Sequence, residues 1–85
     1  MTRSMHLNPA MQAVDVYVDI DGQSVRAVIP REVFEDRLRS AHHPSAWLRA
    51  AQEHAGELAT VIRRRFAARP GDFVVVRSSD FGPHA

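Results

Sequence analysis

Residues 13–29 constrain this chain most, because they have the pattern of a β-hairpin with its own turn. Val14 to Ile20 alternates branched apolar residues with polar ones, as a strand with one buried face does. Asp21 and Gly22 follow, a pair that tolerates the positive φ angles of a type I′ turn. A slip of one residue would destroy the pairing of apolar groups, so the register is well specified. The facing pairs are Val18 with Val25, Val16 with Ala27 and Val14 with Ile29.

Two helices and a third strand are expected after the hairpin. Pro30 ends the second strand and suits the first turn of a short helix over residues 30–40, whose acidic side chains precede its basic ones. A longer helix over 44–69 has apolar residues at spacings of three and four, with Gly56 as a mild defect. Residues 73–77, FVVVR, form a short strand.

We therefore expect an α+β fold of order β-β-α-α-β. Its three-stranded sheet consists of the N-terminal β-hairpin and the C-terminal strand, packed against one short and one long helix. The strand order stays open, because the third strand can join either side of the hairpin. The 85 residues make a single domain, with a structured core over about 13–77 and loosely ordered tails over 1–12 and 78–85.

Composition excludes several classes of function. The absence of cysteine excludes disulfides, thiolate catalysis and Cys-based zinc sites, and a net charge of +1 gives no strong field for nucleic acid or anionic lipid. Residues 1–12 lack the apolar segment of a secretory signal. No apolar run approaches the ~20 residues of a membrane-spanning helix. A cytoplasmic protein is the expectation.

The sequence contains no catalytic or metal-binding motif. Asp15 and Asp19 share the polar face of the first strand and Asp21 lies in the turn, where carboxylates serve acid–base chemistry or simply face solvent. Gly-x-Ser-x-Gly and glycine-rich phosphate loops are absent. No histidine pair has metal-ligand spacing, so we expect structural histidines, no metal and no cofactor. The five histidines are His6, His42, His43, His54 and His84.

Four arginines gather at the end of the longer helix. They suit the negative end of the helix dipole, and they also form a candidate patch for phosphates of a nucleic acid or another anion. The near-neutral charge and the lack of an aromatic stacking platform argue against nucleic acid, which stays an alternative. The residues are Arg63, Arg64, Arg65 and Arg69.

The sheet face turned away from the helices is expected to be partly apolar. An exposed apolar face marks a protein–protein surface, and small chains often pair symmetrically. The leading hypothesis is therefore a non-enzymatic interaction or accessory module that pairs as a homodimer or with another protein partner. A nucleic-acid-binding accessory protein is the alternative, and a small enzyme with an interface site the second alternative. The candidate interaction residues are Tyr17, Arg26, Val28, Phe73 and Val75.

Three segments resemble a family of small bacterial proteins, the domain of unknown function 1488. AVDVYVDIDGQSVRAVIPREVFED is similar to that family's strand, turn, strand and short acidic helix, and GDFVVVRSSD to its closing strand. SAWLRAAQEHAGELATVIRRRFA is similar to its second helix, where a histidine precedes an acidic and apolar stretch, here His54, Glu57 and Ile62. The resemblance implies the same β-β-α-α-β fold and no particular activity.

Overall fold

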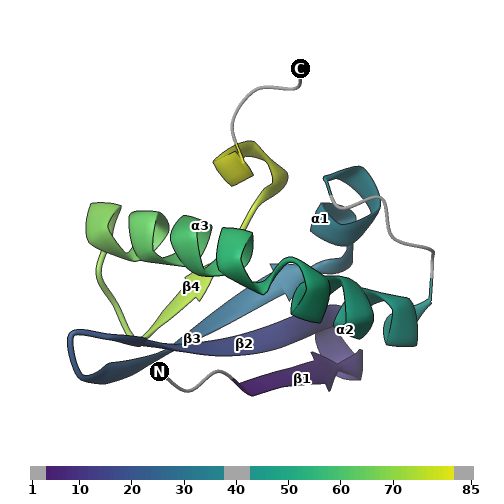
Figure 1. Cartoon of the computed structure of the whole chain (residues 1–85), viewed down its shortest axis with the longest axis horizontal. Helices are drawn as coiled ribbons and strands as arrows, with labels where there is room; N and C mark the ends of the chain where they lie inside the picture. The colour runs from purple at the N-terminus through teal and green to yellow at the C-terminus, as the bar shows by residue number, and fades with distance from the viewer. Residues whose placement is uncertain (1–3, 38–42, 82–85) are drawn as a thin grey trace.

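The computed structural model describes residues 4–37 and 43–81. It is a mixed four-stranded sheet with the three α-helices on one side of it (Figure 1). The strands are β1 (Ser4–Asn8), β2 (Ala13–Ile20), β3 (Gln23–Pro30) and β4 (Phe73–Val75). The helices are α1 (Arg31–Asp36), α2 (Pro44–Glu53) and α3 (Ala55–Ala68), with short 3₁₀ helices η1 (Pro9–Met11) and η2 (Ser78–Phe81).

The predicted hairpin is confirmed together with its register. Strands β2 and β3 pair antiparallel, and all three predicted apolar pairs, from Val14 with Ile29 to Val18 with Val25, face one another. Asp21 and Gly22 have φ angles of 53° and 81°, the positive values that a type I′ turn requires. The turn chemistry and the alternation of the strands therefore specify the same structure.

The expectation of three strands is wrong, because a fourth strand forms in the segment expected to be a loose tail. Strand β1 pairs antiparallel with β2, with Met5 opposite Val16 and Leu7 opposite Val14. Strand β4 pairs parallel with β3, which settles the open strand order as β1-β2-β3-β4. The parallel pairing is possible because the helices form the crossover between β3 and β4. At the other end, η2 replaces part of the tail expected over 78–85.

The helices are shorter than expected. Helix α1 begins directly after Pro30, as predicted, and ends at Asp36; the expected residues 38–40 lie outside the described part of the chain. The single helix expected over 44–69 is divided at His54, whose φ and ψ of −106° and 25° are not helical. A straight helix over those 26 residues would be about 39 Å long, longer than the 34 Å of the molecule's longest extent. The division keeps both halves on the twisted sheet.

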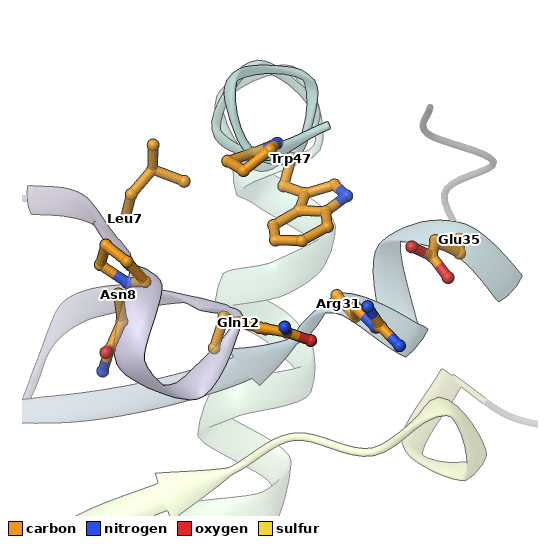
Figure 2. A pocket seen from close by; sticks show the side chains of 9 residues that line it. Leu7, Asn8, Gln12, Arg31, Glu35 and Trp47 are labelled. Carbon is orange, nitrogen blue, oxygen red and sulfur yellow. The ribbon is translucent and has the colours of Figure 1, made fainter. Parts of the chain in front are cut away.

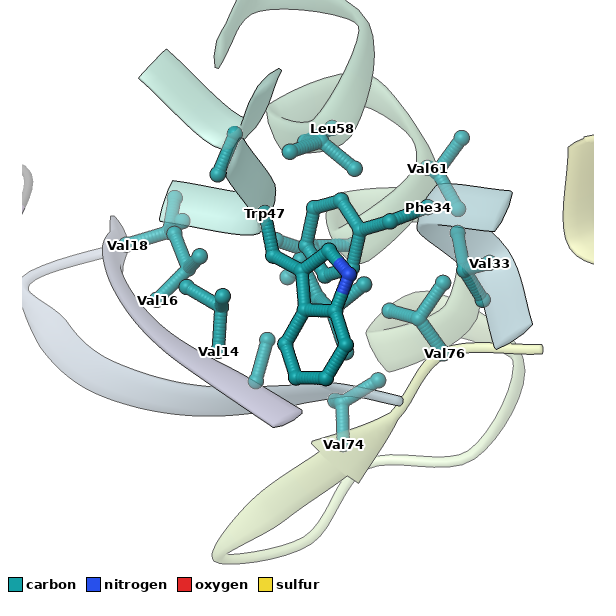
Figure 3. Packing of buried hydrophobic residues seen from close by; sticks show 14 of the residues in the cluster. Val14, Val16, Val18, Val33, Phe34, Trp47, Leu58, Val61, Val74 and Val76 are labelled. Atoms are coloured by element: carbon teal, nitrogen blue, oxygen red, sulfur yellow. The ribbon is translucent and has the colours of Figure 1, made fainter. Parts of the chain in front are cut away.

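The core lies between the sheet and the helices (Figure 3). Val14, Val16 and Val18 of β2 meet Phe34 of α1 and Leu58 of α3, and all five side chains are fully buried. Val74 and Val76 complete the sheet's contribution from the β4 segment, where the Val76 N–H donates to the Val28 carbonyl at 2.9 Å. Within the described residues, no helix has the length and apolar character needed to cross a bilayer.

Candidate functional site: the outer sheet face and a pocket beside Trp47

The sheet face opposite the helices, here called the outer sheet face, brings together all five residues that the sequence indicated. Tyr17 lies opposite Arg26, which lies opposite Phe73, and Val28 lies opposite Val75. Phe73 is 58% exposed, whereas Val28 is buried between its register partners Asp15 and Val75. The helices of the described chain all pack on the other face.

An ion pair crosses the outer sheet face diagonally. The Arg26 Nη2 donates to Asp15 Oδ2 at 3.2 Å, and the Asn8 side-chain amide donates to the same carboxylate at 3.3 and 3.4 Å. Asp15 is 14% exposed and Arg26 40% exposed as side chains. The Arg26 Nε is shielded from solvent and has no hydrogen-bond partner in the described part of the chain. These contacts tie β1, β2 and β3 together and make Asp15 a structural carboxylate.

The acid–base hypothesis gains no support from this arrangement. Asp15 and Asp19 share a face, but four residues of strand separate them by about 13 Å, so they do not share a proton. Asp21 is an exposed turn residue. His6 contacts the Tyr17 ring edge-on, with centroids 6.3 Å apart, and no ion pair of His6 with its register partner Asp15 is present in the described chain.

The arginine patch is dispersed in the structure. Arg65 Nη1 donates to Asp80 Oδ1 at 3.0 Å, which neutralises the central arginine of the patch, and Arg63 also has an interaction of its own. Arg64 and Arg69 are exposed near the end of α3. The structure therefore pairs one of the four predicted arginines with a carboxylate and leaves Arg63, Arg64 and Arg69 exposed.

The histidines have structural roles in the described chain. The His43 Nδ1 accepts from the Ser45 N–H at 3.3 Å and caps α2, and His54 Nδ1 lies 3.5 Å from Glu57 Oε1 where α2 meets α3. No group of three or more potential metal ligands occurs in residues 4–37 and 43–81. His42 and His84 lie outside the described residues.

A pocket of about 500 Å³ opens on the helix side of the sheet, at the end where β1 meets α2 (Figure 2). Its volume falls within the range of small-molecule sites, about 300–1,000 Å³. Most of its wall is apolar, and Arg31, Glu35 and Gln12 supply polar side chains, whereas the lining residue Asn8 directs its amide to Asp15. The apolar lining residues are Leu7, Pro9, Ala13, Pro44 and Trp47.

Trp47 provides a buried donor at this pocket. The residue is 6% exposed, and its indole Nε1 is shielded from solvent and has no hydrogen-bond partner among residues 4–37 and 43–81. An unpaired buried donor of this kind costs about 1–3 kcal/mol. Figure 2 shows the indole edge that carries Nε1 turned toward the side of the pocket where Arg31 and Glu35 lie.

Sequence reasoning missed this pocket because its parts are far apart in the chain. Trp47 lies in the segment expected to form the longer helix, and Leu7 belongs to the strand that was not expected. His6 and Asn8 join the outer sheet face for the same reason. The available signal was the alternation of polar and apolar residues in Ser4–Asn8, which is typical of a strand but weak over five residues.

Comparison with known proteins identifies no relative. No family model matches the sequence, and no curated protein or solved structure matches it. The resemblance to the domain of unknown function 1488 therefore stays a prediction, and a function for this chain has to rest on its two surfaces.

Proposed function

We propose that this chain is a non-enzymatic interaction module of the cytoplasm that forms a homodimer through its outer sheet face. The observation that carries the proposal is that no helix of residues 4–37 and 43–81 covers this face. The described helices all pack on the opposite side, and Phe73 on the outer sheet face is 58% exposed. Tyr17, Phe73 and Arg26 on that face belong to the residue types enriched at protein interfaces.

The charges of the outer sheet face suit a second copy of the same chain. A two-fold contact brings the same patch of both copies together, so the patch must complement itself. Arg26 lies among the carboxylates of Asp15 and Asp19 on this face. Both signs of charge are therefore present, and a second copy meets complementary charge around an apolar and aromatic centre.

The size of the molecule sets how much of the face is needed. A standard interface buries about 800 Å² on each partner, roughly one-seventh of this chain's 5339 Å² surface. The molecule measures 34 by 28 by 22 Å, so a contact of that area uses most of one face. A broad sheet face meets this requirement, whereas the small dispersed arginine surface of α3 does not.

Sedimentation or light scattering over a range of protein concentrations tests the proposal. We expect a dimer with a dissociation constant in the micromolar range, about 10 μM, and a monomer for Phe73→Asp. The matched control is Met11→Asp, since Met11 is 57% exposed but belongs to η1, outside the outer sheet face. A wild-type monomer at about 500 μM, or a Phe73→Asp variant that still dimerises, would contradict the proposal.

The alternative function, nucleic-acid binding, is tested in a separate binding measurement. Electrophoretic shift at low salt with duplex and single-stranded DNA and RNA tests it, and the interaction module predicts no shift. A shift that disappears in the Arg64→Gln and Arg69→Gln double variant would favour the alternative instead. These two residues are suitable because both are exposed, whereas Arg65 is paired with Asp80.

A further inference from the structure

We propose that the pocket beside Trp47 binds a small monocarboxylate with an apolar body. This site lies on the helix side of the sheet, so it is separate from the outer sheet face and does not depend on dimerisation. Three features of the structure support it: the shape of the pocket, a buried donor without a partner, and a cation beside that donor.

The pocket accepts a molecule that is mostly apolar. Its volume of about 500 Å³ fits a ligand of small-molecule size, and Leu7, Pro44 and the Trp47 ring form apolar walls. Leu7 is 37% exposed, although Met5 on the same face of β1 packs against the core and its register partner Val14 is part of the core. An alkyl chain or an aryl ring placed against Leu7 would remove this apolar surface from water.

The Trp47 indole selects for an acceptor on the ligand. Its Nε1–H is buried and unpaired in a residue that is 6% exposed. Solvent does not reach Nε1 in this conformation, so a ligand oxygen pairs with this N–H when the indole turns slightly toward the pocket. A purely apolar ligand leaves the donor unpaired, so an oxygen-bearing ligand has the advantage.

Arg31 makes a carboxylate the best acceptor. Its side chain is exposed at the pocket, and it forms no ion pair within the described residues. The Arg31 side chain and the Nε1 edge of Trp47 border the same side of the pocket (Figure 2). A carboxylate on that side would accept from a neutral donor and a guanidinium together, and charge-assisted hydrogen bonds are the stronger kind.

Glu35 provides a negative charge at the same pocket. The experiment therefore has to distinguish a site for a carboxylate from a site for an ammonium group. It lines the pocket beside Arg31 and already takes part in an interaction of its own. If Glu35 determined the ligand's charge, the site would prefer an ammonium group to a carboxylate. Probes that share one alkyl chain and differ only in the head group distinguish these cases.

The experiment is a ¹H–¹⁵N NMR titration of the ¹⁵N-labelled full chain with octanoate, 1-octanol and octylamine. Trp47 is the sole tryptophan, so the single indole N–H signal reports directly on Nε1. We expect octanoate to bind with a dissociation constant below about 1 mM and to move the indole proton downfield. We expect octanol to bind about tenfold more weakly and octylamine more weakly still.

Variants identify the groups responsible. Arg31→Gln should weaken octanoate about tenfold and leave octanol unchanged, whereas Arg69→Gln, an exposed arginine at the end of α3, should change neither. Trp47→Phe, measured by calorimetry on folded protein, should reduce the preference for octanoate over octanol. If this variant does not fold, the comparison of Arg31→Gln with Arg69→Gln still tests the proposal. The proposal is overturned if octanoate leaves the indole signal in place, if octanol or octylamine binds as well as octanoate, or if Arg31→Gln binds octanoate normally.

Discussion

Asp15 of β2 and Arg26 of β3 form an ion pair of 3.2 Å across the outer sheet face, although they are not register partners. Asp15 lies opposite Val28 and Arg26 opposite Tyr17, so the pair spans the sheet diagonally. The Asn8 amide of β1 reaches the same carboxylate. The polar part of the face is therefore organised by contacts among three strands.

A double-mutant cycle on this pair should give a measurable coupling energy. Asp15→Asn and Arg26→Gln, alone and together, should show a coupling of about 0.5–1 kcal/mol that decreases at high salt, because Arg26 is 40% exposed. Urea unfolding at about 1 μM protein keeps dimerisation out of the measurement. Asp19→Asn, at an exposed position on the same strand, is the control and should change stability by less than about 0.5 kcal/mol. A coupling of zero would show that the pair does not contribute to stability.

Alanine substitutions at Gly22 and Gly56 should change the stability of the protein in opposite directions. Gly56 has no atom within 4 Å of an added Cβ and has no positive φ, so Gly56→Ala should stabilise the protein by about 0.5–1 kcal/mol. Gly22 has a φ of 81°, so Gly22→Ala should destabilise it by about 1 kcal/mol or more although space is free there. Urea unfolding measures both variants. A destabilising Gly56→Ala would mean that the division between α2 and α3 requires glycine.

The hairpin was predictable because its information is local. Alternation over eight residues, a two-residue turn and the apolar pairing all favour one register, so no distant contact was needed to predict it. The position of β1 was not predictable in the same way. Met5 and Leu7 alternate with polar residues, but five residues beside Asn8 and Pro9 give a weak strand signal, and pairing with β2 decides the outcome.

The outer sheet face was predictable from the sequence and the pocket was not, because the first depends on local alternation and the second on distant contacts. Alternation alone predicts one shared face, and the strand register places these residues in neighbouring positions: Tyr17, Arg26, Val28, Phe73 and Val75. The pocket depends on tertiary placement: Leu7 and Trp47 meet only because β1 pairs with β2 while α2 packs over that edge. The division at His54 was not predictable either, because the helical periodicity of the sequence continues through it.

Substitutions of Phe34 and Phe73 should differ in their cost in stability, because the first side chain is in the core and the second is on the surface. Phe34 is fully buried among the core residues shown in Figure 3, so Phe34→Ala should cost about 3–5 kcal/mol and unfold most of a domain this small. Phe34→Leu keeps most of the volume and should cost about 1.5 kcal/mol or less. Phe73→Ala, at 58% exposure, should change monomer stability by less than about 0.5 kcal/mol. Thermal unfolding followed by circular dichroism at low concentration compares the three, and equal losses at both positions would contradict the assigned core.

Asp80 should hold η2 against α3. Its carboxylate accepts from Arg65 Nη1 at 3.0 Å and from the Arg77 N–H at 2.8 Å, and it is 15% exposed as a side chain. Asp80→Ala removes both contacts and should cost about 1–2 kcal/mol. Asp80→Asn keeps an acceptor oxygen but loses the charge, so it should cost about half as much.

The carboxylate of Asp72 provides the control for Asp80, since it is exposed in the loop before β4. Asp72→Ala should change the free energy of unfolding by less than about 0.5 kcal/mol in the same urea measurement. Hydrogen exchange adds a local readout, because the Asp80 N–H donates to the Arg77 carbonyl at 2.9 Å and should exchange faster in Asp80→Ala. If Asp80→Ala matched Asp72→Ala in both measurements, η2 would be held by Phe81, through its packing on the core and its contact with Arg37, and Arg65 would be available to an anion after all.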